Sequence, residues 1–243
     1  MEMMTRFLTD AQQRRLLEVA KEQSSLLAQR DYAWMRLLIE TGMRVNELAT
    51  MTKGQAERAL HDGWLVIGKE QRKGSRRPGK NEAGEYIHPV QRKAHGYVVT
   101  EPVRKCLEAL LHLQQELSPA LVPELDMEPP LLWGRCGVVR GKVMCEHMSV
   151  RSFQARMKHW AYLAGLPNGV SPHWLRHTRG VNIVRRSRSK NPVKVVQLAL
   201  GHANISSTGV YTQIRRDEFE ADMRVVAGGR VRKAVAMRAG GAV

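Results

Sequence analysis

The 243-residue chain has few of the groups that define several common protein classes. Its three cysteines, an odd number, cannot form a complete disulfide framework, which suits a reducing compartment. No CxxC pair is present, and the spacing of Cys136, Cys145 and His147 matches no zinc pattern. No apolar run reaches the ~18 residues that a membrane span needs, and there is no secretory signal. We therefore expect a soluble cytoplasmic protein without a metal site.

Acidic residues are also scarce relative to basic ones. There are 39 Lys and Arg against 23 Asp and Glu, a formal net charge of +16. Such an excess favours a polyanionic partner, most plausibly nucleic acid, over the alternatives of a solvated basic surface or association with ribosomes. An apolar content of 43% indicates a folded chain, and aromatic residues at only 5% agree with a mainly helical one.

Helix signals dominate the first fifty residues. Thr9 and Gln12 have the spacing of a capping box and predict a helix that begins just after Thr9. A second helix, over about 31–41, is expected to end at Gly42, because glycine adopts positive φ readily. A short helix over 44–51 follows.

The hydrophobic period then changes to that of a sheet. Residues 64–67 and 97–99 are β-rich runs on either side of a basic stretch, and they predict a small antiparallel sheet with a long charged connection. Tyr86–Ile87 is a candidate third strand, confined to an edge by Pro89. Later helices are predicted near Pro102, after caps at Ser149, Ser171 and Asn191, and across Phe219–Val226, with a Pro-rich loop at 117–130. The predicted fold class is mainly α with a small antiparallel β-sheet (α+β).

Two segments near the C-terminus carry groups suited to phosphodiester chemistry. His173 and Arg176 are three residues apart in a predicted helix, so both should project from one face and could meet a phosphate. Tyr211 is a possible nucleophile if positive charge assists its phenol, and His202 lies nine residues before it. Taken singly, these residues could equally be a DNA-facing basic helix, a core tyrosine and a histidine at a helix end. No nucleotide-binding loop accompanies them, so cleavage of a phosphodiester would depend on side chains alone.

A third segment comes from the first half of the chain. Arg44 follows a glycine turn and precedes Glu47, which could orient it, although an ordinary (i, i+3) surface pair is the alternative. Jointly, the motifs resemble the tyrosine recombinase (phage integrase) family. The similarity rests on TGMRVNEL from Thr41, VIGK from Val66, HWLRHT from His173 and LGHxxxxxTxxY from Leu200, in this order.

The resemblance implies the fold of the DNA breaking and rejoining catalytic domain and a role for each matching residue. Arg44 and Arg176 would bind the scissile phosphate, and His202 would hydrogen-bond it. Tyr211 would attack to form a 3′-phosphotyrosyl bond, His173 would transfer a proton, and Lys69 would protonate the leaving 5′-oxygen. Because the bond energy is conserved, the family's chemistry uses no metal and no ATP, and no cofactor is expected.

The chain departs from the family pattern in its lysine segment. The hairpin after the lysine is usually short, but here some 25 residues separate Lys69 from the next strand. Lys73 and Lys93, the second in a possible turn over 92–96, are therefore rivals, although the spacing from Arg44 favours Lys69. The residues expected to contact DNA are Lys73, Arg76, Arg77, Lys93 and His177.

The second departure concerns domain organisation. We expect a catalytic domain over 4–227 and a basic, flexible tail over 228–243, without the family's usual N-terminal DNA-binding domain. A naturally short member and a catalytic fragment both fit. The partner would be double-stranded DNA with a specific recombination site, bound by a homotetramer, with a monomer in solution left open. The helix at Phe219–Val226 could dock on a neighbour or pack on its own domain.

Three activities agree with this pattern. Site-specific recombination, by integration, inversion or resolution, is the leading hypothesis. A recombinase-derived DNA-binding regulator is the first alternative, and the retention of Arg44, His173, Arg176, His202 and Tyr211 argues against it. Strand cleavage without exchange, as in type IB topoisomerases and hairpin-forming resolvases, shares the same chemistry and stays open.

Overall fold

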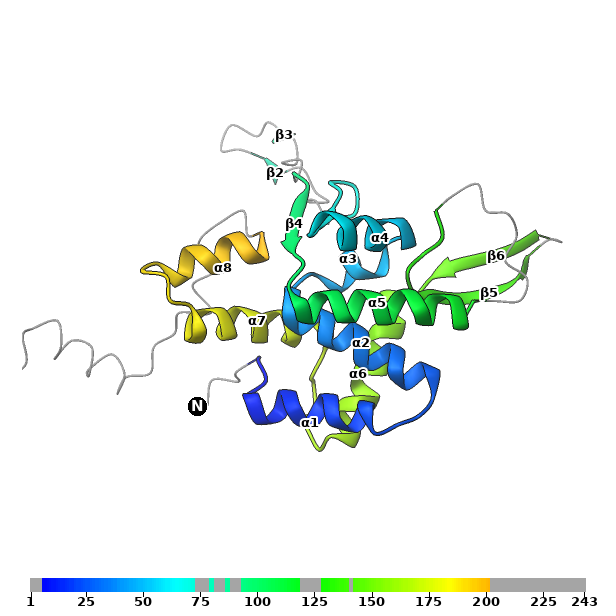
Figure 1. The fold of residues 1–243 in the computed structure, drawn as a ribbon, viewed down its shortest axis with the longest axis horizontal. Coiled ribbons are helices and arrows are strands. Elements are labelled where there is room, and N and C mark those ends of the chain that lie inside the picture. Colours follow the sequence, from blue (N-terminus) through cyan, green and yellow to red (C-terminus); the bar gives the residue numbers. More distant parts are fainter. Residues whose placement is uncertain are drawn as a thin grey trace, which may run out of the picture. The chain divides into compact units, whose positions relative to one another are not determined.

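The computed structural model describes residues 6–72, 79–80, 86–87, 93–118, 128–139 and 142–201, all within a compact unit that extends from Met1 to Tyr211. Helices and short antiparallel ladders make up this part of the chain (Figure 1). The helices are α1 (Asp10–Lys21), α2 (Leu26–Thr41), α3 (Val45–Ala49), α4 (Lys53–Asp62), α5 (Glu101–Glu116), α6 (Val150–Leu163), α7 (Pro172–Arg186) and α8 (Pro192–Leu200). The strands are β1 (Trp64–Ile67), β2 (Gly79–Lys80), β3 (Tyr86–Ile87), β4 (His95–Val98), β5 (Trp133–Val139) and β6 (Lys142–His147).

Local capping explains where the first helices begin and end. The predicted capping box at Thr9 is confirmed, with the Thr9 hydroxyl accepting from the Gln12 N–H at 3.3 Å and the Gln12 side chain accepting from the Thr9 N–H at 2.9 Å. Helix α2 begins about five residues earlier than predicted, because the Ser25 hydroxyl accepts from the Ala28 N–H at 3.2 Å and caps it. It ends at Gly42 with φ 70°, as predicted.

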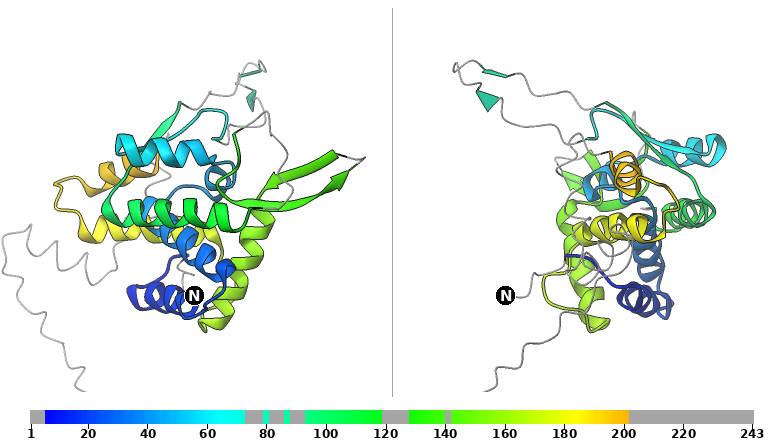
Figure 2. Two further views of the ribbon diagram at one scale, coloured as in Figure 1. Left: turned by 45° about the vertical axis from the view of Figure 1, so that its right-hand side comes forward. Right: turned by 90° about the vertical axis from the view of Figure 1, so that its left-hand side faces the viewer.

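Helix α2 is the centre of the hydrophobic core. It packs against α1, α5 and α7, and the views from two directions agree that these helices surround it (Figure 2). Trp34 and Met35 of α2 are fully buried, and Trp34 meets Phe153 of α6 edge to face with ring centroids 5.1 Å apart. Leu48 of α3 and Met51, two residues beyond its end, are fully buried as well.

A buried aspartate joins α2 to α6. The Asp31 side chain is fully buried. It accepts hydrogen bonds from the indole N–H groups of Trp34 and Trp160, each at 2.9 Å. Arg30 donates to one carboxylate oxygen at 2.9 Å, and Arg156 donates to the other. The four donors offset the cost of burying this charge, which would otherwise be several kcal/mol.

The predicted small sheet is confirmed for its two principal strands. β1 pairs antiparallel with β4, with Trp64 opposite Val98 and Ile67 opposite His95. The prediction of a turn over 92–96 is wrong, since His95 and Gly96 already belong to β4. Helix α4, for which no element was predicted, packs against β1 and is capped by Thr52.

Other strand predictions need correction. Tyr86–Ile87 does form a strand, but it pairs with β2 in a separate ladder and is not a third strand beside β1 and β4. The hairpin of β5 and β6 was not predicted. Its glycines at 134 and 137 weaken the strand pattern in the sequence, and the hairpin extends from the end of α5 on one side of the unit (Figures 1 and 2). The fold class, mainly α with small antiparallel sheets, is confirmed.

Proline and asparagine signals correctly predicted the last two described helices. α7 begins at Pro172, although the Ser171 hydroxyl makes no capping bond. α8 begins at Pro192, with the Asn191 side chain accepting from the Lys194 N–H at 3.0 Å, and ends at Gly201 with φ 60°.

The structure leaves several predictions untouched. Most of the basic connection after β1, most of the 117–130 loop, the helix at Phe219–Val226 and the tail from Gly228 lie outside the described residues. Among the residues that are described, no helix is long and apolar enough to cross a membrane.

The Asp31 cluster generates a stability prediction. Asp31→Ala should lower the free energy of unfolding by roughly 3–5 kcal/mol, because it leaves buried donors and guanidinium charge without their acceptor. Urea denaturation followed by tryptophan fluorescence measures this. Glu57→Ala is the control: the Glu57 carboxylate is exposed and lies 3.7 Å from Lys53, so the loss should stay below about 0.5 kcal/mol. Equal losses in both variants would contradict the prediction.

Candidate active site

A pocket of about 490 Å³ opens where the start of α3, the segment after β1 and the start of α7 meet. These three pieces are far apart in the sequence and carry three of the predicted site residues. The pocket is lined by Met43, Arg44, Val45, Asn46, Glu70, Gln71, Arg72, Val150, Pro172, His173 and Arg176.

Arg44 stands at the N-cap of α3 and is held by Glu47, as predicted. The Arg44 N–H donates to one Glu47 carboxylate oxygen at 2.9 Å, and its guanidinium donates to the other at 3.0 Å. The Arg44 side chain stays 24% exposed, while that of Glu47 is fully buried. The buried Glu47 carboxylate thus holds Arg44 in place, while the Arg44 guanidinium stays accessible. This is not an ordinary surface pair.

Glu47 gathers two further donors from other elements. The Tyr97 hydroxyl of β4 donates at 2.8 Å, and the Arg72 Nε–H donates at 3.4 Å. Burial alone would raise the pKa of Glu47, but the hydrogen bond from the Arg44 N–H, the Arg44 charge, the Tyr97 hydroxyl and the Arg176 charge outweigh it and lower the pKa. The carboxylate is therefore ionised at neutral pH.

Arg176 is only 3% exposed and is held by backbone carbonyls from two distant elements. Its Nη1 donates to the Gly42 carbonyl at 2.6 Å and its Nη2 to the Leu200 carbonyl at 2.7 Å. Both carbonyls are neutral, so these two hydrogen bonds fix the guanidinium without bringing a counter-charge of their own. A Cβ at Gly42 would lie 2.4 Å from a Leu200 methyl, so this approach of α8 to the end of α2 requires glycine.

His173 and Arg176 both line the pocket, as their spacing in α7 predicted. Burial, followed by the charges of Arg176, Arg44 and Arg6, lowers the pKa of His173, which makes it neutral and able to accept a proton at pH 7. His177 lies one turn further along, with its ring centroid 4.4 Å from that of His173. Burial, followed by the charges of His173, Arg176 and Arg6, lowers the pKa of His177 to about 4.

The lysine predictions have a mixed outcome. Lys69 is exposed on the turn after β1, beside the residues that line the pocket, but its own side chain is not among them. Lys93 is exposed, and its backbone carbonyl accepts from Arg72 at 2.8 Å. Lys73, Arg76, Arg77, His202 and Tyr211 lie outside the described residues.

Three side chains around Glu47 were not recognised from the sequence as site residues. They are Arg72, His95 and Tyr97, all from the segment between β1 and the end of β4. The signal for Tyr97 was its inward position in an alternating strand beside Gly96 and Val98. Arg72 was hidden in a run of basic residues, and His95 was assigned to a turn.

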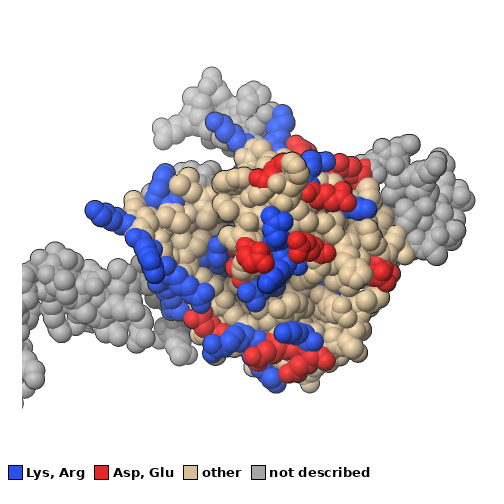
Figure 3. All heavy atoms as spheres, in the orientation of Figure 1, with Lys and Arg blue, Asp and Glu red and all other residues tan. Residues whose placement is uncertain are grey.

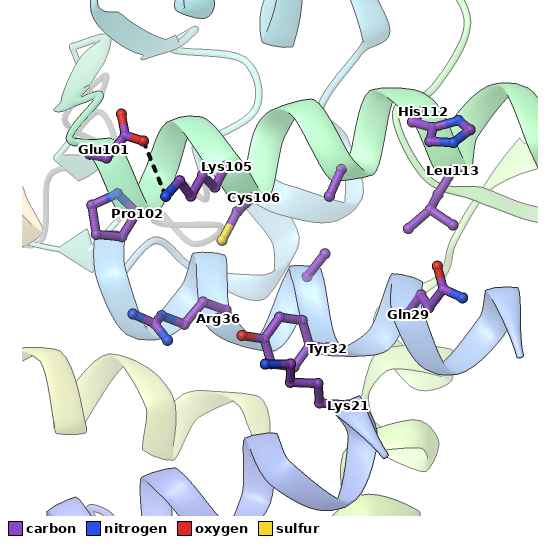
Figure 4. Close-up of a pocket in the computed structure, with 12 residues that line it drawn as sticks. Lys21, Gln29, Tyr32, Arg36, Glu101, Pro102, Lys105, Cys106, His112 and Leu113 are labelled. Atoms are coloured by element: carbon purple, nitrogen blue, oxygen red, sulfur yellow. Dashed lines mark ion pairs between the residues drawn. The ribbon is translucent and has the colours of Figure 1, made fainter. Parts of the chain in front are cut away.

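A second pocket, of about 450 Å³, lies between α2 and α5 (Figure 4). Cys106 faces it, and burial raises the pKa of the Cys106 thiol to about 12, so the thiol stays protonated. The Lys105 ammonium on its rim is paired with Glu101 at 3.4 Å. Lys21 and Arg36 line this pocket as well, but Arg36 is paired with Glu40 at 2.9 Å, and we do not assign the pocket a catalytic role.

Basic side chains also cover the surface from the end of α7 to the start of α8 (Figure 3). The exposed members are Arg185, Arg186, Arg188, Lys190 and Lys194. Arg186 pairs with Asp10 at 2.8 Å. This surface begins at the opposite end of α7 from His173 and Arg176, and it is suited to a polyanion.

A family model described as the phage integrase family matches residues 6–218. The chain belongs to the phage integrase family. The match spans all four motifs that carried the resemblance, so the family prediction is confirmed.

Individual members of the phage integrase family agree with this assignment. Tyrosine recombinase XerD of Pseudomonas putida is 28% identical over 217 residues, covering 88% of this chain and 59% of the relative. XerD of Pseudomonas aeruginosa is 29% identical, covering 84% and 56%. The chain thus spans little more than half the length of these curated relatives.

Solved structures of recombinases share the fold. The crystal structure of XerA recombinase has a TM-score of 0.59 at 20% identity, covering 93% of this chain and 64% of that one. The Tn1549 transposon integrase in complex with circular intermediate DNA has a TM-score of 0.64 at 18% identity, covering 93% and 68%. The predicted fold of the tyrosine recombinase catalytic domain is therefore confirmed.

The lowered pKa of Glu47 generates a prediction for Glu47→Gln. At pH 7 the substitution should reduce the free energy of unfolding by about 2–4 kcal/mol, because Arg44 and Arg72 lose their counter-charge. Unfolded Glu47 binds its proton near the ordinary value of 4.5, and the folded protein binds it at lower pH. The difference from wild type should therefore be full above about pH 5 and shrink as the pH falls below 4.5.

Urea denaturation from pH 3 to 7 tests this dependence. Glu108→Gln is the control, since its 53% exposed side chain is 4.0 Å from Arg104. A stability difference for Glu47→Gln that is independent of pH would contradict the ionised, buried carboxylate.

Proposed function

We propose that this protein is a tyrosine site-specific recombinase that cleaves and rejoins DNA through a 3′-phosphotyrosyl intermediate. The observation that carries the proposal is the convergence of Arg44, His173 and Arg176 on one pocket, although Arg44 is separated from the other two by some 130 residues of sequence. The family assignment and the order of the four motifs support it.

In this proposal the scissile phosphate sits in the pocket between Arg44 and Arg176. The two guanidinium groups neutralise the charge that develops on the non-bridging oxygens in the pentavalent transition state. Both are positioned before DNA arrives, by Glu47 and by two backbone carbonyls, so little reorganisation is required. His202 hydrogen-bonds the same phosphate.

The Tyr211 oxygen attacks phosphorus while the bond to the 5′-oxygen breaks. The phenol proton passes to His173, whose lowered pKa keeps it neutral and able to accept it. A lysine protonates the leaving 5′-oxygen, and Lys69 is the preferred candidate because of its spacing from Arg44 and its position at the pocket edge. Attack of a different 5′-hydroxyl on the phosphotyrosine reverses the step, so the energy of the phosphodiester is conserved.

Double-stranded DNA with a specific recombination site is the proposed substrate. The basic surface over α7 and α8 would contact its phosphates, together with Lys73, Arg76, Arg77, Lys93 and His177. We further propose a homotetramer on DNA and a catalytic domain over 4–227 followed by a basic tail. The Tn1549 integrase structures, determined in complex with DNA, support the choice of partner.

A nicked suicide duplex that carries the cognate site tests the reaction. The wild-type chain should form a covalent protein–DNA adduct, visible by denaturing gel electrophoresis, that survives EDTA. Tyr211→Phe should abolish the adduct, because it removes the attacking oxygen. Arg176→Ala should reduce the rate by on the order of 10²–10³-fold, as for other transition-state donors.

The controls separate the alternative activities. An adduct that persists in Tyr211→Phe would exclude this nucleophile. Specific binding without any adduct would favour the DNA-binding regulator. If the adduct forms but no strand of one site is joined to the other site in a two-site substrate, cleavage without strand exchange would be favoured.

A further inference from the structure

Three consecutive carbonyls at the end of α8 are each bound by a nitrogen from a different element. The Ala199 carbonyl lies 3.2 Å from Nε2 of His95 in β4, the Leu200 carbonyl accepts from Arg176 of α7, and the Gly201 carbonyl accepts from Arg72 at 3.1 Å. These carbonyls belong to the last turn of α8 and its C-cap, where intrahelical partners run out. We name this arrangement, formed by Arg72, His95 and Arg176 around residues 199–201, the carbonyl clamp.

The clamp leaves no spare volume at the helix end. Gly201 has φ 60°, and a Cβ there would lie 2.7 Å from Nη2 of Arg72 and 3.0 Å from Nδ1 of His95. Glycine is therefore required twice, for its backbone conformation and for the close approach of two side chains. The three donors also complement the partial negative charge at the carboxyl end of a helix.

Arg72 connects the clamp to the candidate site. Its guanidinium is 8% exposed and also donates to Glu47 at 3.4 Å and to the Lys93 carbonyl at 2.8 Å. One side chain thus links the carboxylate that orients Arg44, the strand that follows the basic connection and the end of α8. His95 is held in turn by Tyr97, whose ring meets it edge to face with centroids 4.6 Å apart.

The tautomer of His95 follows from its acceptor. A backbone carbonyl can only accept, so Nε2 must carry a proton and donate to Ala199. A side chain that has an N–H donor at the same distance from the backbone can replace the hydrogen bond to Ala199. A side chain without a donor cannot. Glutamine and leucine are therefore matched substitutions for position 95.

We propose that Arg72 and His95 are positioning residues, which fix the end of α8 at Gly201, the residue directly before His202 and its proposed hydrogen bond to the phosphate. This inference rests on the proposed recombinase function. It assigns a role to two side chains that need not touch the DNA. Their effect on cleavage should pass through His202.

A double-mutant cycle measures this dependence on the suicide duplex. Arg72→Ala and His95→Leu should each slow adduct formation by on the order of 10–100-fold, the cost of misplacing a catalytic group by about 1 Å. In a His202→Ala background the same two substitutions should slow it by less than about threefold, since there is no group left to misplace. His95→Gln should recover most of the wild-type rate.

Arg104→Ala is the matched control for loss of a guanidinium at a helix end. Arg104 donates to the Leu60 carbonyl of α4 at 3.3 Å, away from the pocket, and its removal should leave the rate unchanged. Full additivity with His202→Ala would overturn the proposal, because Arg72 and His95 would then act on the phosphate or on the fold as a whole. Loss of the thermal unfolding transition in Arg72→Ala would leave His95→Leu and His95→Gln to decide.

Hydrogen–deuterium exchange provides a readout that does not need activity. The peptide from Lys194 to Gly201 should exchange faster in Arg72→Ala and His95→Leu than in wild type, and at the wild-type rate in Arg104→Ala and His95→Gln. Unchanged exchange in the first two variants would overturn the clamp. Absence of any wild-type adduct would count against the proposed recombinase function alone, and the exchange data would still decide whether the clamp holds α8.

Discussion

The buried carboxylate of Glu47 is the constraint on which the candidate site depends. It receives donors from the backbone and guanidinium of Arg44, from Arg72 and from Tyr97, that is, from α3, the segment after β1 and β4. One negative charge thereby orders two cations and cannot neutralise both. Arg44, Arg72 and Arg176 all line the pocket, and the carboxylates of Glu47 and Glu70 together do not neutralise three guanidinium groups. That is the electrostatic condition for binding a phosphate and for stabilising additional negative charge on it.

Much of this organisation was predictable because it is local. The caps at Thr9, Ser149 and Asn191 and the left-handed glycine at 42 depend on residues within one helical turn, and each is confirmed. The Arg44–Glu47 pair is three residues apart, and the shared face of His173 and Arg176 follows from helical geometry alone. The family motifs then predicted the fold, whose details no periodicity in the chain specifies.

Other features could not be read from the sequence, because their partners are distant or their local signals are weak. Arg72 meets Gly201 across 129 positions and His95 meets Ala199 across 104, and nothing near either residue distinguishes it from a solvated basic side chain. The early start of α2 depended on one serine that competes with several polar neighbours. The β5–β6 hairpin has glycines where a clear strand has β-branched residues, and β3 pairs with β2 although its sequence would equally suit the edge of the β1–β4 ladder.

The two candidate phosphate-binding arginines are supported in opposite ways, and the difference has a chemical consequence. Arg44 is oriented by a carboxylate, which fixes its direction firmly but offsets part of its charge. Arg176 is oriented by the neutral carbonyls of Gly42 and Leu200, which fix it without offsetting charge. The carbonyl of Leu200 becomes available because α8 ends there at a left-handed glycine. The same helix end that starts the chain toward His202 therefore also holds Arg176. A shift of α8 would move the Leu200 carbonyl and with it the guanidinium of Arg176, so the geometry of the pocket depends on the position of the helix.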